Sequence, residues 1–338
     1  MQGFVARRLL VMLPQLLGMS LIAFVLTHSI PADPVAAFLG QRSMEDPRIV
    51  AAFRAQWGLD RPLPEQYLRY VLNLAHGDLG VSIRTHQPVA ADLGRAFPAS
   101  AELAFSATVL SALVGVPFGV LSAVRRNQWP DHLVRAVSLL GVSSPVFWLA
   151  LVGLYVFYFR LGWLPGPGRL DVGVPEPPHL TGMFTVDSAL GGQWRTFEVA
   201  LKHLVLPALV LASVTMGLLT RLTRSSMLDV LGADFIRTAR GKGLPERAVV
   251  FRHALSNALI PTVTMVGLTF GDILSGTVLT ETIFAWPGVG RYAFQSAITL
   301  DFPAILGVSV VIAGVFILVN LLTDMLYLAL DPRLRSVG

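Results

Sequence analysis

Long apolar runs are the feature of this sequence that most limits how the chain can fold. Six runs approach or exceed the ~20 apolar residues that a helix needs to cross a bilayer. They are Leu9–Ile30, Ala101–Val124, Leu133–Phe159, Leu201–Thr220, Pro261–Thr280 and Ala304–Leu330. Only 14% of the 338 residues are charged, whereas soluble domains carry roughly 25%. We therefore expect an all-α polytopic membrane protein with six transmembrane helices.

The first apolar run could be mistaken for a signal peptide, since Arg7 and Arg8 precede it. It is longer than the ~7–15 apolar residues of a signal peptide, and Pro31 follows it in place of a small-residue cleavage site. We interpret this run as a retained first span. The chain has no cysteine, which excludes disulfides and thiolate metal sites.

Lys and Arg gather in one set of connections between the runs, and such residues favour the cytoplasmic side. With a cytoplasmic N-terminus, more than half of the 26 Lys and Arg residues fall in the inside segments. These include Arg7, Arg8, Arg125, Arg126, Arg135, the basic residues of 221–252, Arg333 and Arg335. We therefore predict that both termini lie in the cytoplasm.

Two segments expected on the opposite side of the membrane are long. Residues 31–98 mix charged with aromatic residues and predict an extracytoplasmic insertion after the first span, a small cap held by Trp57, Tyr67 and Tyr70. Residues 160–198 are rich in Pro and Gly and predict an ordered but irregular loop. The chain then divides into 1–30 with the first span, 31–98 as the cap region, and 99–338 as a core with five further spans.

The inside segment 221–260 is much longer than a connection between two adjacent spans requires. Helical periodicity on both sides of Gly241-Lys242-Gly243-Leu244-Pro245 predicts two short helices joined by a break. One apolar face can be formed by Met227, Leu231, Phe235 and Ile236. We expect a rigid projection with apolar and basic faces, which suits docking to another protein.

The same segment resembles the cytoplasmic loop of ATP-binding-cassette (ABC) importer permeases, whose pattern reads Glu-Ala-Ala, three residues, Gly, and a later Leu-Pro. Ala239 and Gly243 match this pattern, while Arg237 and Thr238 replace the Glu and the first Ala. Further segments resemble the family's dipeptide, oligopeptide and nickel branch, and most of all the first (B-type) permease subunit of dipeptide importers. They are Phe4–Arg8, His76–Gly80, Leu180–Met183, Leu279–Gly290 and Asp301–Pro303.

This resemblance implies a type I ABC importer permease in the bacterial cytoplasmic membrane that moves di- or oligopeptides. It implies a homologous second permease, two ATPase subunits and an extracytoplasmic peptide-binding protein as partners. ATP and Mg would bind the ATPase subunits, because this chain lacks GxxxxGK[ST]. The expected ATPase-coupling residues are Arg237, Thr238, Ala239, Arg240, Gly241, Lys242, Gly243 and Pro245. Arg237, Arg240 and Arg247 would pair with carboxylates on the ATPase, and Ala239 is small enough to lie close to its surface.

Asp272 stands out because a carboxylate within a span is costly and usually faces the bundle interior or water. At 100° per residue, Thr269, Asp272, Gly276 and Thr280 fall within an arc of about 80° on the fifth run. We expect these residues, with Glu281, to line the substrate path. Thr264, Gly267, Gly271 and Ser275 lie opposite and suit helix packing. The alternative is that both faces serve packing alone.

Two other interpretations of the chain stay open. A permease for nickel or glutathione would share most of the motifs above. An ion-coupled secondary transporter would need inverted repeats and broken helices at the bilayer midplane, and the sequence has no pair of matching halves. Uptake that continues after ATP depletion, with the proton gradient intact, would favour the secondary transporter.

Overall fold

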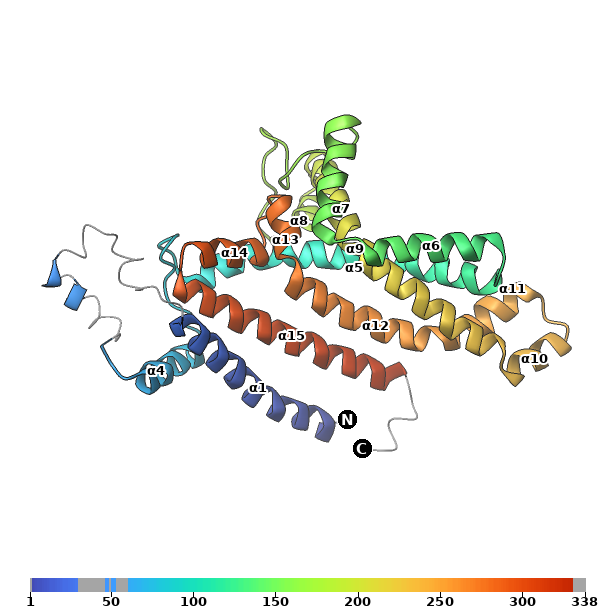
Figure 1. Cartoon of the computed structure of the whole chain (residues 1–338), viewed down its shortest axis with the longest axis horizontal. Coiled ribbons are helices and arrows are strands. Elements are labelled where there is room, and N and C mark those ends of the chain that lie inside the picture. The colour runs from blue at the N-terminus through green and yellow to red at the C-terminus, as the bar shows by residue number, and fades with distance from the viewer. Residues whose placement is uncertain (1, 30–45, 49, 53–59, 331–338) are drawn as a thin grey trace. The chain divides into compact units, whose positions relative to one another are not determined.

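The computed structural model describes residues 2–29, 46–48, 50–52 and 60–330, and this part of the chain is helical (Figure 1). Within it, the extended pairing is an isolated bridge between Val81 and Pro88. The chain forms two compact units, described separately below. The first unit comprises Met1–Pro98 and Pro287–Ile317, and the second comprises Ala99–Trp286 and Leu318–Gly338.

Five helical segments in the described part of the chain are long and apolar enough to cross a membrane. They lie within α1 (Gln2–Ser29), α5 (Val89–Val124), α9 (Trp194–Leu231), the continuous stretch Glu246–Leu274, and α15 (Phe302–Leu330). Several exceed the expected runs because polar residues at their ends continue the helix. The 38 residues of α9 span about 57 Å, well beyond the ~30 Å hydrocarbon layer.

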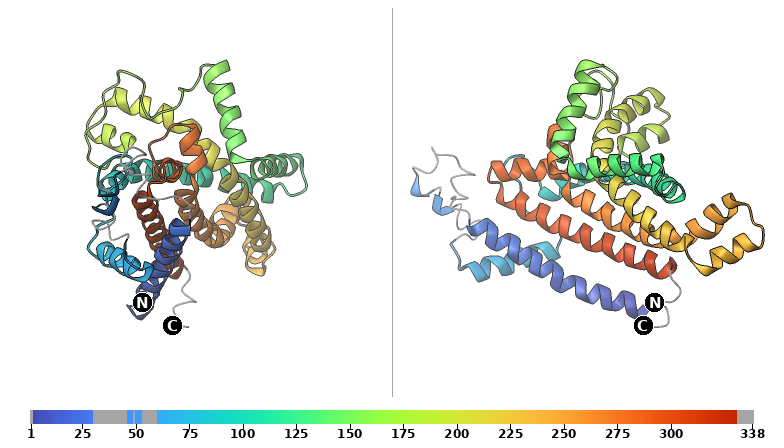
Figure 2. Two further views of the ribbon diagram at one scale, coloured as in Figure 1. Left: turned by 60° about the vertical axis from the view of Figure 1, so that its left-hand side comes forward. Right: turned by 45° about the vertical axis from the view of Figure 1, so that its right-hand side comes forward.

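The third expected run differs from a single straight helix. Residues 129–160 form α6 (Trp129–Ser143), then α7 (Val146–Gly153) continued by the π-helix η1 (Leu154–Arg160), with a bend of 103° (Figure 2). The break lies at Ser144, which is extended with φ −85° and ψ 131°, directly before Pro145. A residue before proline is disfavoured in the helical region, which explains the position of the break. Counted as one broken span, this pair brings the candidates to six.

The fifth expected run, Pro261–Thr280, has different bounds in the structure. Its helix begins at Glu246 and runs through α11 (Glu246–Ala248), the π-helix η2 (Val249–Ala254) and α12 (Leu255–Gly276). Pro261 therefore lies inside a helix, where membrane-protein surroundings tolerate its missing N–H. The helix ends before Thr277, so Thr280 belongs to the separate helix α13 (Val278–Ile283).

In the first unit, an apolar cluster joins the start of α5 to α14 (Val289–Ile298) and α15. Its buried members are Val89, Leu93, Ala96, Val289, Tyr292, Ala304 and Val308. Asp301 is fully buried beside it and accepts hydrogen bonds from Ser82 Oγ at 2.5 Å and from the Arg84 N–H at 3.1 Å. It also accepts from the Ala304 N–H at 3.2 Å, which caps the first turn of α15.

The expected cap region 31–98 includes α4 (Leu63–Ala75), which packs on α1, and its last residues, from Val89, already belong to α5. Tyr67 Oη lies 3.0 Å from both Ser20 Oγ and the Leu17 carbonyl oxygen. The rings of Tyr67 and Tyr70 lie 5.4 and 6.2 Å from the Phe24 ring. The two tyrosines therefore anchor α4 to the first span, while Trp57 lies outside the described residues.

Candidate functional site

The projection expected from segment 221–260 is a helical knob, defined here as residues 234–254. It comprises α10 (Asp234–Gly241), the turn 242–245, α11 and η2. Gly243 adopts φ +76°, a left-handed conformation that glycine reaches without a Cβ penalty. Its N–H donates to the Arg240 carbonyl at 2.9 Å, which closes the end of α10. The chain reverses at Gly243, and Pro245 then precedes the first residue of α11.

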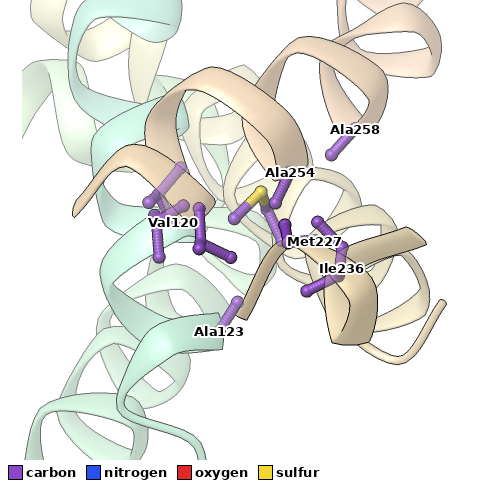
Figure 3. Packing of buried hydrophobic residues seen from close by; sticks show 9 residues of the cluster. Val120, Ala123, Met227, Ile236, Ala254 and Ala258 are labelled. Carbon is purple, nitrogen blue, oxygen red and sulfur yellow. The ribbon is translucent and has the colours of Figure 1, made fainter. Parts of the chain in front are cut away.

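The inner face of the knob is an apolar cluster shared with α5, α9 and α12 (Figure 3). Its buried members are Val120, Ala123, Met227, Ile236, Ala239, Val249, Val250, Ala254 and Ala258. Met227 and Ile236 are fully buried, as expected from the apolar face in the sequence. The knob is therefore packed onto the ends of neighbouring helices, so that it forms a continuation of their core.

Two residues of the knob face differently from the expected arrangement. Ala239 is 8% exposed and lies within this cluster, so its small side chain allows close packing inside the chain. Phe235, which the sequence pattern places on the apolar face, is 46% exposed. Adjacent helical residues differ by about 100° in direction, and α10 directs Ile236 into the cluster while Phe235 lies outside it. This helical angle was the signal that the sequence interpretation missed.

The outer face of the knob is polar and mostly cationic. Its exposed residues include Arg237, Thr238, Arg240, Lys242, Gly243 and Arg247. Arg240 pairs with Glu246 across the turn, through Nη2–Oε1 at 2.7 Å and Nε–Oε2 at 3.1 Å. This hydrogen bonding holds the pKa of Arg240 above its ordinary value. Arg237 Nη1 lies 3.4 Å from Asp234 Oδ1, and 74% of the Arg237 side chain is exposed.

The residues expected to line the substrate path lie in different surroundings. On α12, Thr269 is buried and donates to the Met265 carbonyl at 2.8 Å, whereas Asp272 is exposed. Gly276 is the last residue of α12, and Thr280 and Glu281 are buried on α13. On the expected packing face, a Cβ on Gly267 would lie 2.6 Å from Thr323 Oγ1. Asp272 is therefore exposed on α12, whereas Thr280 and Glu281 are buried on the separate helix α13.

Glu281 is fully buried within a hydrogen-bonded network of the second unit. Its Oε1 accepts from Ser100 Oγ at 2.6 Å and from Thr277 Oγ1 at 2.7 Å. Next to Ser100 in sequence, the Ala99 carbonyl accepts from Trp286 Nε1 at 2.8 Å. These contacts fasten α13 and the following turn to α5.

The irregular part of the expected loop 160–198 is residues 161–183, since α8 (Phe184–Leu190) and the start of α9 occupy most of the rest, and it is held by a buried ion pair. Arg169 Nη2 donates to Glu102 Oε2 at 2.5 Å and to the Gly182 carbonyl at 3.1 Å. Its guanidinium carbon lies 3.6 Å from the centre of the Phe184 ring, at the start of α8. Glu102 also accepts from the N–H and the hydroxyl of Thr185. No local pattern marks this pair, because 67 residues separate its members.

These observations define a polytopic helical membrane protein with a helical knob packed onto the ends of its long helices. Residues 115–336 match the family model "Binding-protein-dependent transport system inner membrane component", and residues 1–104 match the N-terminal model of such membrane components. The chain belongs to this family of binding-protein-dependent transport system inner membrane components. The expected permease family and helical fold are confirmed.

Curated relatives match this chain over nearly its whole length. The probable D,D-dipeptide transport system permease protein DdpB of Escherichia coli K12 is 50% identical over 321 residues, which cover 95% of this chain and 94% of the relative. The di/tripeptide transport system permease protein DppB of Pseudomonas aeruginosa is 43% identical and covers 99% of both chains. The dipeptide permease DppB of Alkalihalophilus pseudofirmus is 41% identical over 99% of this chain and 100% of its own.

A solved structure shares the fold at low sequence identity. An inward-facing structure of the MetNI methionine ABC transporter superposes with a TM-score of 0.51 and 16% identity. The superposition covers 71% of this chain and 96% of the solved chain. This likeness supports the fold of an ABC importer permease.

Proposed function

We propose that this chain is the permease subunit of an ABC importer that carries di- or oligopeptides into the cytoplasm. Peptide as the substrate is supported by the names of relatives that are 41–50% identical, which are a dipeptide, a probable D,D-dipeptide and a di/tripeptide transport system permease protein. The subunit would pair with a homologous permease in the bacterial inner membrane, with both termini cytoplasmic. Two ATPase subunits would supply the energy, and an extracytoplasmic binding protein would deliver the peptide.

The observation that carries the mechanism is the knob. Its inner face is part of the chain's core, while its outer face exposes Arg237, Lys242 and Arg247. A projection that is rigid inside and charged outside is suited to docking in a cleft of an ATPase, where charges steer association. The coupling contacts would come from the exposed residues Arg237, Thr238, Lys242 and Gly243. Ala239, Arg240, Gly241 and Pro245 would support the shape of the surface.

The exposed phenyl ring of Phe235 adds an apolar element to this surface. Aromatic residues, phenylalanine included, and arginine are enriched at protein–protein interfaces relative to the rest of the protein surface. We therefore include Phe235 in the docking surface, together with the exposed charged residues of the knob. Asp272 remains our candidate for a residue that lines the path and meets the cationic amino end of a peptide, because it is exposed on α12.

Peptide uptake by the assembled importer in lipid vesicles tests the coupling role. Gly243→Leu forces a bulky residue into the left-handed conformation and alters the tip of the knob, so ATP hydrolysis should no longer drive uptake. Gly162→Leu is a matched control, because Gly162 also has positive φ (+61°) and open surroundings but lies outside the knob. Normal uptake in Gly243→Leu with normal ATPase binding would refute the coupling role. Competition by dipeptide, nickel and glutathione in the same assay identifies the substrate class.

A further inference from the structure

Asp131, near the start of α6, is the centre of a polar network that joins three helices of the second unit. Its carboxylate is fully buried. Arg224 of α9 binds it with both prongs of the guanidinium, Nε–Oδ1 at 2.8 Å and Nη2–Oδ2 at 2.9 Å. Ser122 Oγ of α5 donates to Oδ1 at 2.5 Å, and the Asn127 N–H donates to Oδ2 at 2.9 Å. The carboxylate therefore receives four hydrogen bonds from α5, from α9 and from the turn that enters α6.

The geometry of this network is unusually well specified. A bidentate arginine fixes both the distance and the plane of the carboxylate. Asn127, whose N–H donates to Asp131, holds a left-handed backbone conformation (φ +60°) in the turn that enters α6. A buried ion pair contributes little net stability, because desolvation offsets the attraction, but losing one partner is strongly destabilising. Such a pair is better suited to fixing one arrangement of helices than to strengthening the fold.

The helices that the network joins also approach one another at backbone distance. A Cβ on Gly119 of α5 would lie 2.6 Å from Thr223 Cβ and 2.8 Å from the Thr220 carbonyl of α9. A Cβ on Gly217 of α9 would lie 2.6 Å from the Ser138 carbonyl of α6. At these two glycines α9 therefore packs closely against both α5 and α6.

The network adjoins the inner face of the knob. Ser122 lies between Val120 and Ala123 on α5, and Arg224 lies one turn before Met227 on α9. Val120, Ala123 and Met227 are the residues against which the knob packs its own apolar face (Figure 3). A displacement of the knob therefore acts on the same helix ends that Asp131 and Arg224 hold together.

We propose that Asp131 and Arg224 are positioning residues that make α5, α6 and α9 follow the knob as one body during transport. The proposal rests on the coupling role of the knob. In a complex that lacks the pair, the ATPases still bind the outer face of the knob and hydrolyse ATP, because that face is unchanged. The motion of the knob then reaches the three helices only in part, and less peptide is moved for each ATP hydrolysed.

The test measures peptide transported per ATP hydrolysed by the assembled importer in lipid vesicles. Asp131→Asn removes the charge, and Arg224→Lys keeps the charge but loses the bidentate fork. Both should retain bound ATPase subunits and lower the transport-to-ATP ratio on the order of tenfold, within the range typical of coupling between sites. Arg135→Gln is the matched control, an exposed arginine one turn beyond Asp131 on α6, and should keep the wild-type ratio.

Two results would overturn the proposal. A wild-type ratio in both variants would show that the pair does not transmit the motion. Failure of both variants to assemble would show that the pair serves folding alone. Gly243→Leu, measured in parallel, separates this proposal from the coupling role itself. If Gly243→Leu also keeps the wild-type ratio of peptide transported to ATP hydrolysed, the knob is not the coupling element. If Gly243→Leu lowers this ratio while the Asp131 and Arg224 variants do not, only the role of Asp131 and Arg224 fails.

Discussion

Arg169 and Glu102 form an ion pair in which 93% of the arginine side chain and 96% of the glutamate side chain are buried, with 2.5 Å between Nη2 and Oε2. The pair connects loop 161–183 to α5, and the arginine also lies against the Phe184 ring. Because both charged groups are shielded from solvent, each would be a costly unpaired charge without the other. The pair therefore holds the loop in one position on the second unit.

Replacing Arg169 with methionine should destabilise this loop. The substitution leaves the Glu102 carboxylate buried without its counter-charge, which typically costs about 3–5 kcal/mol. We expect a lower thermal unfolding midpoint and faster proteolysis within residues 161–183. Lys202→Met is the control, because it breaks the exposed Lys202–Glu198 pair, and it should leave both measurements unchanged. Equal effects of the two substitutions would contradict the role assigned to Arg169.

Asp187 makes the same loop sensitive to acid. Burial, the largest single influence, raises the pKa of Asp187, but hydrogen bonds from the Thr181 hydroxyl and from N–H groups including those of Thr181 and Gly182 together lower it below its ordinary value. A lowered folded-state pKa gives stability that is present above the unfolded pKa of about 3.9 and is lost as the pH falls through the folded value.

The thermal midpoint should therefore fall as the pH is lowered below about 4, and Asp187→Asn should reduce both the midpoint at pH 7 and its acid dependence. Asp229→Asn, at an exposed position on α9, serves as the control and should retain the wild-type pH profile. If Asp187→Asn loses stability at neutral pH yet keeps the full acid dependence, another carboxyl group is responsible for it.

Gly119→Ala should weaken the contact between α5 and α9. The added methyl group would lie 2.6 Å from Thr223 Cβ, and overpacking of this kind costs about 1–3 kcal/mol. We expect a lower thermal midpoint of the purified complex. Gly94→Ala introduces the same methyl group on the same helix with no atom within 4 Å, and should be tolerated. A destabilisation that is the same at both positions would point to helix flexibility instead of close packing.

Exchanging Arg240 and Glu246 tests whether Arg240 stabilises the turn of the knob or contacts the ATPase directly. If Arg240 mainly holds the turn, Arg240→Glu should lower peptide uptake, and the double variant Arg240→Glu, Glu246→Arg should recover most of it because the ion pair is rebuilt. If Arg240 instead pairs with a carboxylate of the ATPase, as the sequence interpretation expected, the double variant should stay as impaired as the single one. Uptake relative to ATPase bound is the measurement.

The regular features of this fold could be predicted because they depend on local chemistry. Apolar length identified α1 and α15 closely, and the glycine-rich break identified the reversal at Gly243. The family was predictable from motifs spread along the chain. Helix ends were harder to predict from the sequence. The helix that contains Pro261, for example, extends back to Glu246, because no residue between them ends it.

The remaining features depend on contacts between distant residues. Pro145 marks a break, but the 103° angle depends on what α6 and α7 each pack against. Arg169 and Glu102 each appear in the sequence as an ordinary charged residue, and only folding brings them together. Asp131 illustrates the same limit, because nothing near it in sequence predicts its pairing with Arg224.

The helix is continuous from Glu246 to Gly276, and this continuity limits where residues can be inserted or deleted. One residue inserted at Lys242 could be absorbed by the turn. One residue inserted within η2 would rotate everything beyond it by about 100° relative to the knob, so Thr262 and Thr269 would leave their buried positions. Insertions and deletions should therefore be tolerated in the turn of the knob and excluded from the helix that follows it.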